Sequence, residues 1–269
     1  MKKRFIIYLL FLAMIGMVLY AFFIEPKRIV THRYTVGSND GQPSVKVVQL
    51  SDIHIQENYP VSQLEKIVTK VNNEKPDIIF FTGDLFDNYA QYGPTEEVIA
   101  ALSRLSAPLG KYAVWGNHDY GGAAIHAYPE ILAAADFQLL ENTGQNISLS
   151  HEKSIYVAGL DDSLLGNSSI DDALANRQSP YTILLSHEPD EADNVLDKNI
   201  QLILSGHSHG GQVKIPFLTI KNVMAENYFE RFYTLANDTT LYVNTGLGTT
   251  KIPARFRVPP EIAVFDLYV

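Results

Sequence analysis

Five short polar segments, each at the end of an apolar run, constrain this chain more than any other feature. They read Asp52-Ile-His54, Gly83-Asp84-Leu-Phe-Asp87, Gly116-Asn117-His118-Asp119, Ser186-His187-Glu188 and Gly206-His207-Ser208-His209. Together they hold five of the eight histidines, with several carboxylates and one asparagine. Oxygen and nitrogen donors of this kind suit two hard or borderline metal ions. Because each segment directly follows a predicted strand, we expect the donors to meet at the carboxyl ends of strands.

The apolar pattern predicts an alternation of strands and helices. Strands are predicted at residues 29–36, 45–50, 78–82, 112–115, 154–159, 181–186, 201–205, 232–235, 240–244 and 261–268, and helices at residues 60–75, 94–105, 127–135, 170–176 and 188–197. Strand–helix alternation that gives way to hairpins indicates an α/β (α+β) fold, a mixed sheet with helical cover. The first two strands flank a turn signal at residues 39–41, so we expect them to form a hairpin.

An uncharged apolar run, Phe5–Ile24, follows the first four residues of the chain. As a helix this run is about 30 Å long, the thickness of a bilayer core, and it predicts one transmembrane helix. A cleaved signal peptide is the alternative, but its apolar region is usually only about 7–15 residues long. We therefore divide the chain into an anchor at residues 1–24, a juxtamembrane segment with a first edge strand at 25–44, and one folded domain at 45–269.

The charge and the cysteine content exclude several classes of partner and of metal site. The formal net charge is −9, and without Lys2, Lys3 and Arg4 the chain has 18 basic against 30 acidic residues, or −12. An acidic body repels polyanions, so we expect no nucleic acid partner. The three N-terminal cations favour a cytoplasmic N-terminus and an extracytoplasmic body on a single-pass membrane protein. With no cysteine, the chain has neither disulfides nor a thiolate metal site.

The order and residue types of the five polar segments resemble the calcineurin-like metallophosphoesterase superfamily. The resemblance extends from about Lys46 to the C-terminus, and the segment His207–Gln212 is similar to that of bacterial, membrane-anchored members. It implies an α-β-β-α sandwich of two mixed β-sheets flanked by helices. It also implies two divalent metal ions, and mixed oxygen and nitrogen donors suit Mn, Fe, Zn or Co.

The resemblance assigns a metal ligand role to seven residues. Asp52, His54 and His209 match the ligands of one ion, Asn117, His187 and His207 match those of the other, and Asp84 matches the bridging carboxylate. A shared anion is physically sensible because two cations about 3.5–4 Å apart repel each other.

Two further residues match catalytic positions of the superfamily. His118 matches a non-ligand histidine that donates a proton to the leaving alkoxide or holds the developing charge, and Asp87 matches the carboxylate that orients it. Asp119 is either a support for the metal centre or a helix N-cap. Protein phosphatases of the superfamily have Arg-Gly after the bridging segment and Asn-His-Glu, whereas this chain has Asn88-Tyr89 and Asp119, which argues against a phosphoprotein substrate.

Two residues are candidates for contact with the substrate. Arg255 ends a C-terminal segment that resembles one in membrane-tethered members. It is either a residue that contacts a phosphate of the substrate, since a guanidinium suits phosphate, or an ordinary surface cation. Asp161 lies in a loop where a substrate role competes with ordinary turn chemistry. We expect specificity to depend on the loops at residues 161–168 and 217–231.

The expected function is a binuclear-metal-dependent phosphoester hydrolase that uses a metal-bridging hydroxide. Its substrate would be a phosphorylated small molecule or lipid, in particular a membrane or envelope phosphate. One alternative is a UDP-2,3-diacylglucosamine-type pyrophosphate hydrolase, which an extracytoplasmic site would disfavour because nucleotide-linked lipid precursors are cytoplasmic. An alternative of another class is a non-catalytic metal-binding membrane protein, and the oligomeric state stays open.

Overall fold

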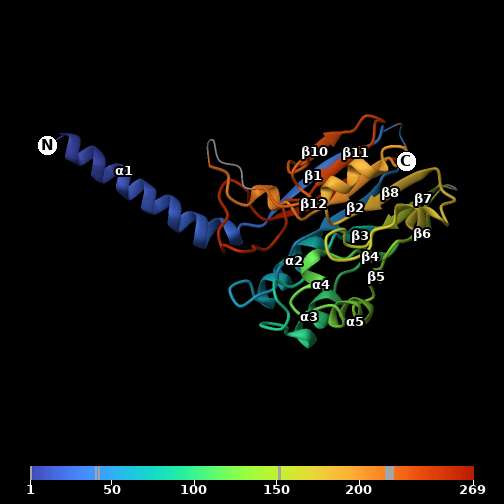
Figure 1. Ribbon diagram of the computed structural model, residues 1–269, viewed down its shortest axis with the longest axis horizontal. Coiled ribbons are helices and arrows are strands. Elements are labelled where there is room, and N and C mark those ends of the chain that lie inside the picture. The colour runs from blue at the N-terminus through green and yellow to red at the C-terminus, as the bar shows by residue number, and fades with distance from the viewer. Residues whose placement is uncertain (1, 40, 42, 151–152, 216–220) are drawn as a thin grey trace.

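The computed structural model describes residues 2–39, 41, 43–150, 153–215 and 221–269. Met1 of the predicted anchor, Asp40 of the predicted turn and residues 217–220 of the predicted specificity loop lie outside the described residues. Figure 1 shows a long N-terminal helix that projects from one end of a layered body. The chain termini lie at opposite ends of the molecule.

The projecting helix comprises α1 (Lys2–Leu19), a π-helical turn (Tyr20–Ile24) and a 3-10 turn (Glu25–Lys27). It is the one segment of the described residues that is long and apolar enough to cross a membrane. Its apolar side chains are exposed along α1, while Ala21 and Pro26 at its base are buried against the body. Exposure of this kind is typical of a segment that faces lipid rather than a protein core.

The body contains two six-stranded sheets. The first has the order β1 (Val30–Val36), β12 (Glu261–Leu267), β2 (Val45–Leu50), β3 (Ile78–Phe81), β4 (Lys111–Ala113), β5 (Gln138–Leu139). The second has the order β10 (Phe232–Thr234), β11 (Thr240–Val243), β9 (Leu202–Ser205), β8 (Tyr181–Leu185), β7 (Ser154–Gly159), β6 (Thr143–Ser148). Both sheets contain parallel and antiparallel pairs.

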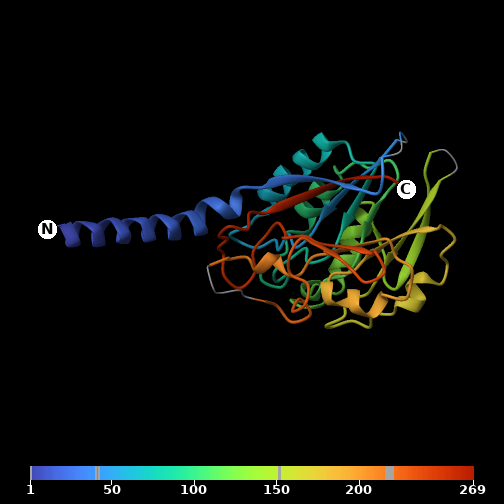
Figure 2. The ribbon, with the colours of Figure 1, turned by 90° about the horizontal axis from the view of Figure 1, so that it is seen from above.

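Helices cover the outer face of each sheet. The first sheet carries α2 (Val61–Glu74), α3 (Thr95–Leu102) and α5 (Ala127–Ala134), and the second carries α6 (Ile170–Leu174) and the 3-10 helix η3 (Pro189–Val195). The short helices α4 (Asn117–Tyr120) and η4 (His209–Gly211) lie in the loops of the polar segments. The four layers confirm the predicted α-β-β-α sandwich (Figures 1 and 2).

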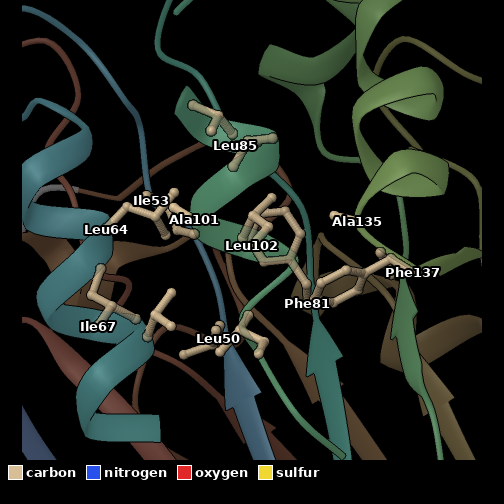
Figure 3. Close-up of a cluster of buried hydrophobic side chains, with 14 of the residues drawn as sticks. Leu50, Ile53, Leu64, Ile67, Phe81, Leu85, Ala101, Leu102, Ala135 and Phe137 are labelled. Atoms are coloured by element: carbon tan, nitrogen blue, oxygen red, sulfur yellow. The ribbon is translucent and has the colours of Figure 1, made fainter. Parts of the chain in front are cut away.

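The sequence pattern explains these layers. Along β2, Val48 and Leu50 point to the helical layer while Val47 points to the second sheet, because side chains alternate across a strand. On α2 the buried residues Leu64 and Ile67 repeat at helical spacing. Figure 3 shows these side chains packed with Leu50 and Phe81 between the helices and the first sheet.

The predicted hairpin of the first two strands is wrong. β1 pairs in parallel with β12, and β12 lies between β1 and β2. Six of the seven residues of β12 are buried, and a central position gives such a strand hydrogen-bonding partners on both sides. The strands predicted at 232–235 and 240–244, after the pattern gives way to hairpins, do pair as an antiparallel hairpin, β10 and β11. The strands β5 and β6 were not predicted, and the helix expected at 188–197 is the shorter η3.

Candidate metal centre

The polar segments meet at one edge of the sandwich. Asp52, Asp84 and Asn117 follow the adjacent parallel strands β2, β3 and β4. His187 and His207 follow the adjacent parallel strands β8 and β9 of the second sheet. The backbone nitrogen of His207 donates to both carboxylate oxygens of Asp52 at 3.1 Å, so the two sets of loops are in direct contact.

The backbone is strained at this edge. Five of the predicted ligands have a positive φ angle, namely Asp52 (50°), His54 (46°), Asp84 (62°), His207 (63°) and His209 (49°). Non-glycine residues rarely adopt this left-handed conformation, and such residues concentrate at functional sites. Next to Asp84, a Cβ atom at Gly83 would lie 2.8 Å from Nδ1 of His187, so only glycine permits this close approach.

The first cluster of donor atoms contains Asp52, His54 and His209. Nε2 of His209 lies 3.1 Å from Nε2 of His54 and 3.2 Å from Oδ1 of Asp52. Nε2 of His54 lies 3.8 Å from the same carboxylate oxygen. All three side chains are buried. The three residues assigned to one metal by resemblance therefore present their donor atoms to one point.

The second cluster contains Asn117, His187 and His207. Nδ1 of His207 lies 3.1 Å from Oδ1 of Asn117 and 3.2 Å from Nε2 of His187. Asp84 lies between the clusters, because its Oδ2 is 3.4 Å from Nε2 of His54 and 3.3 Å from Nε2 of His187. This is the position that a bridging carboxylate requires.

Outer hydrogen bonds direct imidazole nitrogens into the centre. Nδ1 of His187 lies 2.6 Å from the carbonyl oxygen of Thr82, and Nε2 of His207 lies 2.8 Å from that of Val223. A carbonyl only accepts, so these nitrogens carry a proton, and the opposite nitrogens are the atoms that face the cluster. Nδ1 of His54 faces a carboxylate oxygen of Asp87 at 3.4 Å, an ion-pair contact without a hydrogen bond.

The donor set fits two divalent ions. Several facing donor atoms are 3.1–3.4 Å apart, which is the separation of neighbouring ligands that share an ion at bond lengths of about 2.1 Å. Lone pairs and carboxylate oxygens held this close in a buried site repel each other unless a cation lies among them. The residues therefore match a pair of metal ions with oxygen and nitrogen ligands.

The electrostatics divide the histidines into two groups. Burial lowers the pKa of His54 and of His187, but the neighbouring carboxylates more than offset it and raise the pKa of His54 to about 9 and that of His187 well above its usual range. Burial raises the pKa of Asp84, but the neighbouring imidazoles of His187, His118 and His54 more than offset it and hold that pKa below its usual range. Burial lowers the pKa of His207 to about 4, with help from His187, and burial likewise lowers the pKa of His209 to about 4. Asp84 is thus kept ionised and His207 and His209 neutral, whereas His54 and His187 release a proton when they bind a metal.

The structure changes the expected relation between His118 and Asp87. Nδ1 of His118 lies 2.7 Å from the backbone carbonyl of Asp87, whereas the nearest carboxylate oxygen is 3.9 Å away. That carboxylate lies closer to His54, at 3.4 Å. His118 is therefore oriented by a main-chain oxygen, while the side chain of Asp87 supports a candidate ligand.

Asp119 supports the loop that carries Asp84. Its buried carboxylate accepts backbone N–H groups of Asp84 at 2.7 Å, Leu85 at 2.9 Å and Gly116 at 3.0 Å. The first two bonds hold the strained turn of Asp84, and the third caps helix α4. Asp119 therefore supports the loop of the metal centre, and the N-cap interpretation is wrong, because Gly116 is the N-cap of α4 and Asp119 lies at the third helical position.

Arg255 is fully buried beside the first cluster. Its Nη2 lies 3.3 Å from Nδ1 of His209, and its nitrogens donate to the carbonyl oxygens of Thr245, Gly248 and Val258. Every nitrogen of the guanidinium is engaged, so this placement argues against the phosphate contact suggested by the sequence. It points to a positioning role behind His209.

Asp161 is also engaged by the protein. Its carboxylate accepts the hydroxyl of Tyr120 at 2.6 Å and the backbone N–H groups of Asp162 and Asn167 at 2.8 Å. These contacts favour the turn interpretation over the substrate interpretation.

Sequence reasoning missed the role of Glu188. This buried carboxylate lies within reach of His187 and His207 and accepts both the backbone N–H and the hydroxyl of Ser163. Its position directly after His187 was a usable signal, but the bond to Ser163 depends on tertiary structure.

Comparisons with known proteins identify the family to which this chain is similar. The family model of the calcineurin-like phosphoesterases matches residues 45–211. The uncharacterized metallophosphoesterase YkuE of Bacillus subtilis is 39% identical over 254 residues, covering 92% of this chain and 88% of YkuE. A Danio rerio transmembrane protein with a metallophosphoesterase domain is 32% identical, covering 81% of this chain but only 52% of its own length. A solved dimetal phosphatase from Danio rerio has 13% identity and a TM-score of 0.47, with 84% of this chain and 94% of that chain covered.

Proposed function

This chain belongs to the calcineurin-like phosphoesterase family, and from that premise we propose that it hydrolyses phosphate esters at a binuclear metal centre. It is a metallophosphoesterase, and the family is dimetal-dependent. The observation that carries the binuclear proposal is the position of Asp84 between two clusters of donor atoms. We propose the folded domain as residues 45–269.

The proposed ligands are seven residues from both sheets. Asp52, His54 and His209 would hold one ion, Asn117, His187 and His207 the other, and Asp84 would contact both. Two divalent ions at such a site lower the pKa of water and neutralise charge on a phosphoryl group. The ion identity is proposed among Mn, Fe, Zn and Co.

The proton for the leaving group is proposed to come from His118. The Asp87 carbonyl keeps Nδ1 of His118 protonated, so Nε2 is the atom that gains and loses a proton. In hydrolysis, water adds to phosphorus, the bond to the ester oxygen breaks, and protonated Nε2 gives its proton to that oxygen. Asp119 and Arg255 touch none of the reacting atoms and act through the loops that they hold.

We further propose that the protein is a single-pass membrane protein with an extracytoplasmic body. The apolar helix at Lys2–Lys27 supports the membrane position, and the three cations before Phe5 support the orientation. The proposed substrate is a phosphate ester of a membrane or envelope molecule. A lipid pyrophosphate substrate has no specific support, and an extracytoplasmic site disfavours it.

Metal binding and turnover of Asp84→Asn test this function. The purified full chain is loaded with Mn²⁺ or Zn²⁺, and bound metal and hydrolysis of p-nitrophenyl phosphate and its diester are measured. We expect the variant to bind less than the wild-type metal content and to lose turnover. Asp171→Asn, at a side chain 82% exposed, is the matched control. Two metals per chain with wild-type turnover in Asp84→Asn would refute the binuclear proposal.

A further inference from the structure

Three loops surround the point where the N-terminal helix leaves the body. They comprise residues 212–215, 221–224 and 250–256, and both ribbon views place them at the end of the body that carries α1 (Figures 1 and 2). Each loop has one large apolar side chain in solvent: Ile215 is 49% exposed, Val223 65% and Ile252 51%. We call the three loops the rim.

The base of the helix is fixed to the rim. The carbonyl oxygen of Ala21 accepts the backbone N–H of Arg255 at 2.9 Å, and the ring of Tyr20 contacts Phe256 edge-on. Two main-chain hydrogen bonds then join the loops: Lys214 donates to Phe256 at 2.9 Å, and Phe256 donates to Gln212 at 3.0 Å. A bilayer that α1 spans would therefore lie close to these loops, since no flexible linker separates them from the helix.

The rim is also continuous with the metal centre. Nδ2 of Asn222 donates to the carbonyl oxygen of His207 at 2.8 Å, and the Val223 carbonyl accepts from Nε2 of the same histidine. A pocket between the loops is lined by His209, Gln212 and Ile252 among others. Whatever contacts the rim is therefore next to the candidate metal centre.

Cations accompany the apolar side chains. Lys214, Lys221 and Lys251 lie on the three loops, and Lys27 and Arg28 lie at the end of the helix. Of these, Lys214 faces Glu230 at 3.7 Å, while Lys27, Arg28, Lys221 and Lys251 are exposed. Apolar side chains interspersed with lysines suit the boundary between acyl chains and anionic headgroups.

We propose that the rim docks on the surface of the bilayer that α1 spans, with Ile215, Val223 and Ile252 inserted at the headgroup boundary. The proposal rests on the proposed function in one respect, the membrane position of α1. It adds a second membrane contact, made by the folded body itself. Docking would turn the pocket beside His209 toward the headgroups, so that a lipid phosphate reaches the metal centre without leaving the membrane surface.

Site-specific labels test the docking directly, because the chain contains no cysteine. Ile215→Cys, Val223→Cys and Ile252→Cys are each introduced into the full chain, labelled with an environment-sensitive fluorophore and placed in nanodiscs of phosphatidylcholine and phosphatidylglycerol. Ser38→Cys is the matched control, since this exposed residue follows β1 at the opposite end of the body. Leu12→Cys in the middle of α1 reports insertion of the helix.

We expect the three rim labels to shift to shorter emission wavelength and to be quenched by lipids with a nitroxide near the headgroup, while the Ser38→Cys label does neither. The Leu12→Cys label should be quenched by lipids with a nitroxide deep on the acyl chain. Omitting phosphatidylglycerol should weaken the quenching at the rim but not at Leu12→Cys. Rim labels that behave like Ser38→Cys, with Leu12→Cys quenched, would refute docking and leave the anchor intact. Absence of quenching at Leu12→Cys as well would refute both the anchor and the docking. None of these readouts requires turnover, so a failure of membrane docking can be distinguished from a failure of the proposed hydrolysis.

Discussion

Replacement of Arg255 by methionine should destabilise the protein strongly, because the guanidinium joins three loop carbonyls in a fully buried position. Its bonds to Thr245 and Val258 are 2.9 and 3.1 Å long, and those to Gly248 are 2.6 and 2.9 Å long. Methionine keeps much of the volume but donates no hydrogen bond. Each buried carbonyl that loses its donor costs about 1–3 kcal/mol.

The three costs will not add fully, because neighbouring groups relax and water can enter. We therefore expect a loss of about 3–5 kcal/mol in the free energy of unfolding, the lower part of the sum of three such costs. Arg255→Lys should lose less, since one ammonium group can still donate to some of these carbonyls. Arg255→Met should also disturb the metal centre, because the loop that Arg255 holds contacts a candidate ligand: the backbone nitrogens of Leu247 and Gly248 donate to the carbonyl of Asp52.

The single tryptophan of the chain makes the measurement direct. Trp115 is buried in the helical layer, so its fluorescence follows urea unfolding of the full chain in detergent, with and without added metal. Arg257→Met is the matched control, at an exposed arginine two residues away, and should change stability by no more than about 0.5 kcal/mol. If Arg255→Met unfolds within about 1 kcal/mol of the wild-type protein, the buried guanidinium does not hold these loops and the reasoning is refuted.

Three further predictions follow from the site and the fold. His118→Ala should retain its metal but lose roughly 10²–10⁴ in turnover, with a smaller loss for esters of nitrophenol, because such a leaving group needs no proton; an equal loss for all leaving groups would count against proton donation. Prolonged dialysis against EDTA should abolish turnover and lower the urea midpoint, and Mn²⁺ or Zn²⁺ should restore both; full activity of a metal-free sample would contradict the metal requirement. Burial raises the pKa of Glu261, but Arg231 and the hydroxyls of Tyr242 and Thr245 hold it below its usual range. A depressed carboxyl pKa stabilises the fold above the unfolded value of about 4.3 and ceases to do so as the pH falls through the folded value. The stability difference between wild type and Glu261→Gln should thus be largest near pH 7 and shrink below about pH 4; a difference that grows as the pH falls would be the wrong sign.

The local parts of this structure were predictable from the sequence. The strand before each polar segment and the helix at Val61–Glu74 follow from apolar periodicity, which depends only on neighbouring residues. The residue types of the five segments indicated metal chemistry, and their positions after strands indicated that they would meet. The acidic charge, the absence of cysteine and the apolar N-terminal run are likewise properties of the sequence alone.

Tertiary structure decided which groups face each other. A turn signal between β1 and β2 predicted a hairpin, but β12, more than 200 residues further along the chain, takes the place between them. The orientation of His118 by a backbone carbonyl was likewise invisible, because main-chain oxygens have no signature in the sequence.

Arg255 illustrates the physical reason most clearly. As a residue type it suits a phosphate, yet the packing of Thr245, Gly248 and Val258 around it leaves three buried carbonyls that require a donor. The same packing brings its backbone nitrogen to the base of the N-terminal helix. Residue identity and period are local and can be read along the chain, whereas burial and hydrogen-bond partners depend on contacts between distant segments and exist only once the chain has folded.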